Sequence, residues 1–115
     1  MFEVLEIIFR KGQSGDIPKV FDLIKELALF EKAPEQVIVT PEQMLEDGFG
    51  NNSAYGLFVA ESEGVVIGMA VFYYRYSTWK GKTVYLEDLL VTENFRNQGV
   101  GSGLLNMVLE HAKSI

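Results

Sequence analysis

A glycine-rich turn between a predicted strand and a predicted helix could bind a phosphate group. The strand is predicted over 84–91, and the turn follows it with the sequence Arg96-Asn97-Gln98-Gly99-Val100-Gly101. Apolar residues at helical spacing then predict a helix, and they are Val100, Leu104, Val108 and Ala112. Glycines at 99, 101 and 103 leave backbone N–H groups uncovered where this helix begins, so that these groups and the helix dipole can face an anion. The turn therefore predicts a phosphate-bearing cofactor, and the alternative is an ordinary glycine turn without a ligand.

Two other kinds of phosphate-binding turn fit this sequence less well. A dinucleotide-binding fingerprint would place its third glycine where Leu104 stands, and no strand with a ribose-binding acid follows. A P-loop needs Gly-Lys-Ser/Thr after the turn, and the sequence has none there. A dinucleotide-dependent oxidoreductase is therefore a distant alternative.

The spacing Arg96-x-x-Gly99-x-Gly101 resembles the Arg/Gln-x-x-Gly-x-Gly/Ala signature of the GNAT N-acetyltransferases, which binds the pyrophosphate of acetyl-coenzyme A (acetyl-CoA). Further runs resemble the spermidine/spermine N-acetyltransferases, in the same order: LIKELALFE (23–31), EDGFG (46–50), STWKG (77–81) and YLED (85–88). Within that group, Phe30-Glu31-Lys32 and the STWKG run are closer to the thialysine N-acetyltransferase branch. The resemblance spans about residues 8–112. It implies an α/β GNAT acyl-CoA N-acyltransferase fold, with a mixed, mostly antiparallel sheet flanked by helices.

The resemblance also implies where acetyl-CoA, as co-substrate, would bind. The backbone of the predicted strand would contact it at Leu89, Leu90 and Val91. The turn would contact it at Asn97, Gln98, Gly99, Val100, Gly101 and Ser102. Arg96 would add positive charge for the phosphates. Asn97 replaces a glycine that is frequent in the family, and asparagine tolerates unusual backbone angles better than most residues.

The resemblance assigns the chemistry to a pair of carboxylates. Transfer of an acetyl group needs a neutral amine, and the pKa of an alkylamine is near that of lysine, about 10.4, so a base must accept a proton. Glu87 matches the family's glutamate in Leu-Glu-Asp and is the predicted base, acting directly or through water; a solvent-facing strand residue or an ion pair is the alternative. Asp88 is predicted on the opposite strand face, where it would bind substrate or satisfy backbone groups.

Contacts with the substrate amine are implied at three other positions. Phe30 and Glu31 match a family Tyr/Phe-Glu pair, in which the carboxylate pairs with the cation and the ring supplies apolar contact. The alternative for Phe30 is core packing at the end of a helix. Trp79 follows Ser77, where polyamine-specific members carry aspartate, so a short amine or a lysine-like amino acid fits better than spermine. The alternative for Trp79 is packing against the sheet.

Composition and charge narrow the classes of partner. The chain has 115 residues, no cysteine and 48% hydrophobic residues, which suits one domain over 1–115 in the cytoplasm. Acidic residues near the start and the lack of a long apolar run argue against a signal peptide and a membrane span. The net charge is −6, and the segment 31–63 holds seven of the sixteen acids against one base, Lys32. Such a surface repels nucleic acid and attracts an amine, with ordinary solubilising charge as the alternative; no metal site is expected.

Pattern and turn residues predict the elements that position these side chains. They are a strand over 4–9, a helix capped by Asp16, a short helix from Thr40-Pro41 to Gly48, a hairpin of 55–61 with 65–76, and a turn at 80–82. The order β, α, α, β, β, β, α matches the front part of the GNAT fold.

The family continues after the last of these helices with a strand, a helix and a closing hairpin, and this sequence does not contain them. We therefore expect one wall of the family's pantetheine groove and the tyrosine that protonates the leaving thiolate to be missing. The five tyrosines and His111 are expected to be packing or surface residues. The alternative function is a non-catalytic fragment that binds CoA or another chain, and an apolar sheet edge would favour a homodimer.

Overall fold

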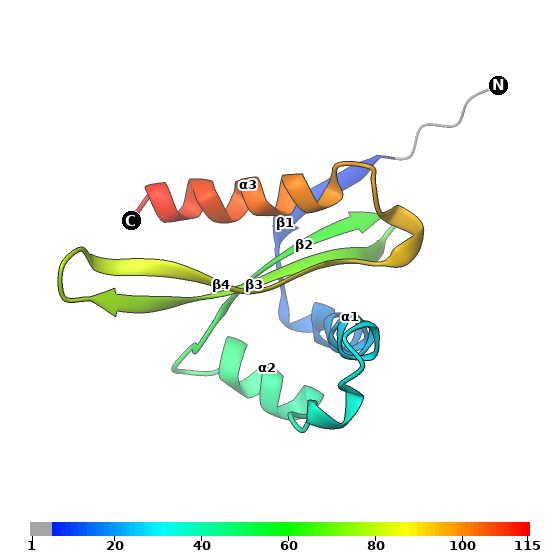
Figure 1. The fold of residues 1–115 in the computed structure, drawn as a ribbon, viewed down its shortest axis with the longest axis horizontal. Helices are drawn as coiled ribbons and strands as arrows, with labels where there is room; N and C mark the ends of the chain where they lie inside the picture. The colour runs from blue at the N-terminus through cyan, green and yellow to red at the C-terminus, as the bar shows by residue number, and fades with distance from the viewer. Residues whose placement is uncertain (1–5) are drawn as a thin grey trace.

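One four-stranded antiparallel sheet forms the centre of the fold (Figure 1). The computed structural model describes residues 6–115. The strands are β1 (Ile7–Lys11), β2 (Gly56–Ser62), β3 (Val65–Ser77) and β4 (Gly81–Val91). They lie side by side in the order of the sequence, so β1 and β4 form the two edges of this sheet.

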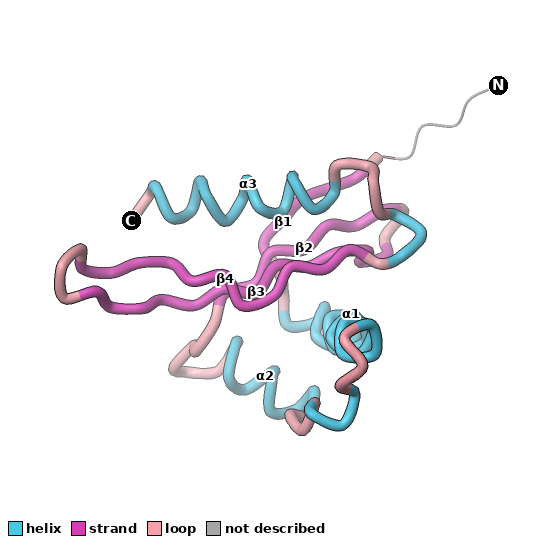
Figure 2. The backbone as a smooth tube through the Cα atoms, viewed as in Figure 1, coloured by secondary structure: helices cyan, strands magenta, loops and turns pink. Residues whose placement is uncertain are grey.

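Helices cover both faces of the sheet, as Figures 1 and 2 show. The α-helices of the described residues are α1 (Ile17–Phe30), α2 (Pro41–Phe49) and α3 (Val100–Lys113), and single 3-10 turns occupy Ser14–Asp16, Pro34–Gln36 and Glu93–Phe95. α1 and α2 pack on one face around Leu23 and Met69, and α3 packs on the other around Leu104 and Ala70. The predicted order β, α, α, β, β, β, α is confirmed.

Local capping signals act differently at α1 and α2. Thr40 accepts a hydrogen bond from the Gln43 backbone N–H at 3.1 Å, and Pro41 stands in the first turn of α2, as predicted. Asp16 takes the N-cap position of α1, but its side chain caps no backbone N–H of that helix. Its carboxylate instead accepts hydrogen bonds from the Arg10 guanidinium of β1 at 2.8 and 2.9 Å. The start of α1 is thereby tied to the sheet.

The hairpins form as predicted, with small shifts at their ends. Glu63 and Gly64 join β2 to β3, and both have positive φ (51° and 80°), as a two-residue hairpin turn requires. The turn between β3 and β4 occupies 78–80, so Gly81, predicted in that turn, is the first residue of β4. β1 ends two residues later than predicted, and positions 4 and 5 of the predicted strand lie outside the described residues. Within residues 6–115, no helix combines the length and apolar content that crossing a membrane requires.

Candidate active site

A β-bulge in β4 positions the two predicted carboxylates. The register of β4 on β3 skips Glu87, since Asp88 and Leu86 pair with successive residues of β3. Leu86 and Leu89 pack into the same core beside α3, although an odd number of positions separates them. The extra residue of the bulge lies between them and explains why both side chains face α3. Side chains therefore do not alternate strictly at this point, and the prediction that Glu87 and Asp88 lie on opposite faces of the strand does not hold. The bulge holds both carboxylates at one point of the edge strand.

Asp88 has an unusual electrostatic environment at this point. Burial raises the pKa of Asp88, and the Glu87 and Glu31 carboxylates raise it further. Asp88 is partly buried, whereas Glu87 and Glu31 are exposed. The charge of Glu31 reaches Asp88 from the end of α1, so the structure gathers three carboxylates from two elements. This concentration of negative charge suits a bound cation.

The end of α1 presents the predicted substrate pair to solvent. Phe30 is the last residue of the helix and is 71% exposed, which excludes the alternative of core packing. Glu31 is the C-cap, and Lys32 follows in the left-handed conformation with φ 60°. The Ala33 N–H then donates to the Ala28 carbonyl at 2.8 Å and closes a Schellman-type ending. This ending fixes the backbone beside both predicted substrate residues.

Glu26 of α1 fixes the segment that leads into the glycine-rich turn. Its two carboxylate oxygens accept hydrogen bonds from the Thr92 hydroxyl at 2.8 Å and from the Arg96 guanidinium at 3.1 Å. Arg96 Nε also donates to the Val91 carbonyl at 2.9 Å, and the guanidinium lies 5.5 Å from the centre of the Phe30 ring. Protein groups thus hold Arg96, so it positions the turn, and Glu26 pairs with its charge. The supply of charge to the phosphates stays a prediction.

Sequence reasoning missed Glu26 as a site residue. Glu26 lies 70 positions before Arg96, and no local pattern joins the two. The one available signal is its spacing of four residues from Phe30, which places both on the same face of α1.

The turn itself presents a row of free backbone donors. Asn97 and Gly99 have left-handed backbones, with φ values of 64° and 80°. Among residues 6–115, the backbone N–H groups from 97 to 102 make no hydrogen bond of good geometry to a protein acceptor, and the first turn-to-helix bond is Gly103 N–H to Gly99 C=O at 3.0 Å. Alternating left-handed residues followed by a helix start form a concave nest of donors, in which the helix dipole adds to the attraction for an anion.

The outer edge of β4 continues this row of donors. The Thr92 N–H donates to the Ile67 carbonyl of β3 at 2.8 Å. This bond fixes which residues of β4 direct their backbone groups toward β3 and which direct them to the free edge. By that alternation, the backbone of Leu90 points toward β3, and those of Leu89 and Val91 point to the free edge. Of the three predicted strand contacts, Leu89 therefore offers its backbone N–H and C=O to a ligand and Val91 its N–H, since Arg96 Nε already donates to the Val91 carbonyl. Leu90 pairs within the sheet.

Trp79 lies apart from the other predicted substrate residues. It stands in the 78–80 turn, where its N–H donates to Ser77 Oγ at 3.2 Å. Figure 1 shows that the β3–β4 hairpin extends away from α1 and α2. The strand from Gly81 to Glu87 adds about 20 Å to this separation. Trp79 is 94% exposed, so it also does not pack against the sheet.

Solved acetyltransferases share this fold. An aminoglycoside N-acetyltransferase in complex with CoA superposes with a TM-score of 0.74 at 22% identity, covering 97% of this chain and 72% of that one. Glucosamine-6-phosphate N-acetyltransferase from Arabidopsis thaliana gives a TM-score of 0.74 at 22% identity, covering 95% of this chain and 76% of that one. At this identity, the likeness establishes the fold alone.

Sequence comparison establishes the family. A bovine (Bos taurus) thialysine N-epsilon-acetyltransferase is 38% identical over 114 residues, which cover 92% of this chain and 67% of the relative. A human (Homo sapiens) spermidine/spermine N(1)-acetyltransferase-like protein is 34% identical over 110 residues, covering 90% of this chain and 16% of that protein. The family description that matches residues 18–115 is "Acetyltransferase (GNAT) family". Since that match spans most of the sequence and agrees with the fold, the chain belongs to the GNAT family of acetyltransferases.

Proposed function

We propose that this GNAT chain transfers the acetyl group of acetyl-CoA to a small primary amine of the thialysine or short-diamine class, and that residues 1–115 act as one domain. The proposal rests on one observation: the free N–H groups of 97–102 continue along a strand edge to the carboxylates of Glu87 and Asp88. The relatives named thialysine N-epsilon-acetyltransferase and spermidine/spermine N(1)-acetyltransferase-like protein support the class of acceptor. The lack of cysteine supports a cytoplasmic location.

The donor would lie along the edge of β4. Its pyrophosphate would accept hydrogen bonds from the N–H groups of 97–102, where the start of α3 adds positive potential. Its extended amide arm would pair with the backbone of Leu89 and the N–H of Val91, as a strand pairs with a sheet edge. Binding of the pyrophosphate by backbone N–H groups needs no particular side chain in the turn, which agrees with Asn97 and Gln98 being exposed.

The acceptor amine would lie between the bulge of β4 and the end of α1. The Glu31 and Asp88 carboxylates would bind the ammonium group of the incoming amine, and the exposed Phe30 ring would contact its carbon chain. Glu87 would accept the proton of the reacting nitrogen, directly or through water. The neutral nitrogen then attacks the thioester carbonyl, so that a C–N bond forms while the C–S bond breaks, and the leaving thiolate takes up the proton that the nitrogen loses as the amide forms.

A homodimer would give Trp79 a place in this site. Within one chain, Trp79 stands at the tip of a hairpin that extends away from Glu31. The tip carries positive charge, since Arg75, Lys80 and Lys82 lie within 73–84 and no acid does. Such an arm would be attracted by the acidic segment 31–63 of a second copy, where its tryptophan could cover the amine site.

Turnover measurements test the proposal. The 115-residue chain is mixed with acetyl-CoA and one amine, thialysine or spermidine, and the release of the CoA thiol is followed. We expect release to require both substrates and to fall at least about 100-fold in a Glu87→Gln variant, the usual contribution of a general base. Binding of acetyl-CoA without turnover of any amine would favour a non-catalytic CoA-binding protein, and absence of acetyl-CoA binding would contradict the proposal.

A further inference from the structure

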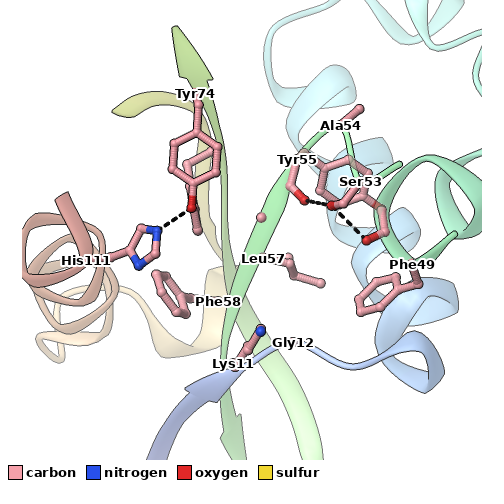
Figure 3. A pocket seen from close by; sticks show the side chains of 13 residues that line it. Lys11, Gly12, Phe49, Ser53, Ala54, Tyr55, Leu57, Phe58, Tyr74 and His111 are labelled. Carbon is pink, nitrogen blue, oxygen red and sulfur yellow. Dashed lines mark hydrogen bonds between the residues drawn. The ribbon is translucent and has the colours of Figure 1, made fainter. Parts of the chain in front are cut away.

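A cavity of about 420 Å³ lies around the start of β2, on the side of the sheet away from β4 (Figure 3). β1 pairs with β2 only as far as Lys11 opposite Phe58, so the first residues of β2 continue past the end of β1. The ends of α2 and α3 close this space from the two faces of the sheet. No residue of β4 or of the glycine-rich turn lines it. We propose that this cavity binds a small planar anion of the aromatic carboxylate class.

The walls of the cavity are aromatic and held in place. Four rings line it on the two sides of the sheet, Phe58 and Phe72 on the side of α3, and Phe49 and Tyr55 on the side of α2 (Figure 3). Phe58 and Phe72 stack with ring centres 5.1 Å apart. A side chain at Gly48 or Gly56 would clash with the rings of Tyr55 or Phe72, so glycine at these two positions lets the rings lie flat on the backbone. Flat aromatic walls of this kind favour a flat, largely apolar ligand.

A polar pair lies beside Phe58 and Phe72, on the α3 side of the cavity (Figure 3). Tyr74 Oη and His111 Nε2 are 2.6 Å apart, and the imidazole lies 5.1 Å from the centre of the Phe72 ring. In the neutral pair, one hydrogen occupies the bond, and one more remains on either Tyr74 Oη or His111 Nδ1. Whichever atom donates within the pair, a donor is left over for a ligand. This donor suits an acceptor such as a carboxylate oxygen.

The charge that lines the cavity is positive. Lys11 is the charged side chain of the lining, and within residues 6–115 it makes no ion pair or side-chain hydrogen bond. Among residues 6–115, no carboxylate lines the cavity; Asp47 is near enough to raise the pKa of Tyr55, after the larger effect of burial, but lies outside the lining. In a chain with a net charge of −6, a cavity with a cation and no acid is selective for an anion.

An unpaired backbone donor lies at the same strand edge. The Gly12 N–H donates to the Leu57 carbonyl at 2.8 Å, which continues the ladder between β1 and β2 for one residue. The reciprocal bond, from the Leu57 N–H to the Gly12 carbonyl, is absent among the described residues. Because the Leu57 backbone points toward β1, its N–H faces away from β3 by the alternation of an antiparallel ladder. Leu57 itself is 4% exposed. A buried N–H without a partner is costly, so a ligand acceptor at this point would be stabilising.

The cavity is separate from the candidate active site. α3 joins the two, because its N-terminus forms the glycine-rich turn and its residue His111 lines the cavity. Eleven residues of helix place His111 about 16 Å along the axis from Val100. Binding in the cavity therefore does not depend on acetyl-CoA, and the two proposals can fail independently.

Calorimetric titration of the 115-residue chain with naphthalene-2-carboxylate, in the absence of acetyl-CoA, tests the inference. We expect binding of one equivalent, at least about tenfold weaker binding of the neutral naphthalene-2-carboxamide, and the same loss for the carboxylate in a Lys11→Gln variant. Lys19→Gln, at another exposed lysine, serves as the matched control and should leave the affinity unchanged. Because Lys11 is exposed, its substitution does not threaten folding.

A second variant tests the polar pair. Tyr74→Phe keeps the ring and removes the hydroxyl, so it should weaken the carboxylate severalfold. No binding of the carboxylate, equal binding of acid and amide, or an unchanged affinity in Lys11→Gln would each overturn the inference. None of these outcomes bears on whether the chain binds acetyl-CoA.

Discussion

Glu26 on α1 and Arg96 at the start of the glycine-rich turn form an ion pair of 3.1 Å, although 70 positions separate them in the sequence. The second oxygen of Glu26 accepts the hydroxyl of Thr92. One carboxylate thus joins the helix that ends in Phe30 and Glu31 to the segment that enters the turn. This connection holds the proposed amine end and the proposed phosphate end of the site in a fixed relationship.

Removal of this carboxylate should destabilise the fold. A Glu26→Ala variant loses hydrogen bonds to Thr92 and Arg96, and we expect its free energy of unfolding to fall by about 1 kcal/mol, since the pair is about one-third exposed. Glu110→Ala is the matched control, because Glu110 pairs with Lys113 on an exposed helix surface. Urea denaturation of both variants measures the difference. Equal losses in the two variants would show that Glu26 makes no special connection.

Gly99 should matter for both folding and acetyl-CoA binding. Its φ of 80° is unfavourable for alanine, so Gly99→Ala should lower the free energy of unfolding by about 1 kcal/mol and shift the N–H groups of the turn. Gly64 has the same φ of 80° in the β2–β3 turn, far from the proposed site. Gly64→Ala should therefore cost similar stability but leave the acetyl-CoA dissociation constant unchanged. Calorimetry on both variants separates backbone strain from ligand binding, and an equal loss of affinity would contradict the assignment.

Asp88 should reduce stability at neutral pH. Burial and the carboxylates of Glu87 and Glu31 raise the pKa of Asp88, so the folded chain keeps this proton to a higher pH than the unfolded chain, in which the pKa is about 3.9. The free energy of unfolding therefore falls as the pH rises above that value. An Asp88→Asn variant should be more stable than the wild type at pH 7, and the gain should vanish below about pH 4.

Asp16 serves as a control, because the pH dependence of its contribution to stability should have the opposite sign. The Arg10 guanidinium lowers the pKa of Asp16, so its contribution to stability is present above the unfolded value and is lost as the pH falls through the folded one. Asp16→Asn should thus be less stable at pH 7 and equal to the wild type in acid. Denaturation curves over a range of pH check both signs, and a pH-independent effect of Asp88→Asn would contradict the proposed environment.

If the chain forms the proposed homodimer, two inactive variants should restore activity to each other when they are mixed. If Trp79 of one copy completes the site of the other, Trp79→Ala and Glu31→Gln should each lose activity, and their mixture should regain it. Random exchange of subunits makes about half of the dimers mixed, and one of the two sites in each mixed dimer carries both intact residues, so about a quarter of all sites are restored. A mixture no more active than its components would place Trp79 outside the site.

Local patterns in the sequence predicted much of the fold. The capping residue Thr40 and the apolar spacing from Val100 onward use interactions within one element, and both predictions are confirmed. The Glu63-Gly64 turn is a local signal as well. Asp16 shows where such a signal is insufficient, because Arg10 of another element competes for its carboxylate.

Features of the site that depend on distant pairing were not predictable. The bulge at Glu87 exists only in the register between β4 and β3, so periodicity within β4 could not reveal it. Glu26 meets Arg96 only after α1 packs against the sheet. The exposure of Trp79 follows from the length of a hairpin that extends beyond the helices, which residue type does not encode.

Backbone amide NMR during a titration with acetyl-CoA shows whether acetyl-CoA binds at the turn and along β4. The proposed site predicts the largest chemical-shift changes at the amides of 97–102, with further changes at Leu89 and Val91. Binding that leaves these amides unchanged, or no binding, would contradict the proposed acetyl-CoA site.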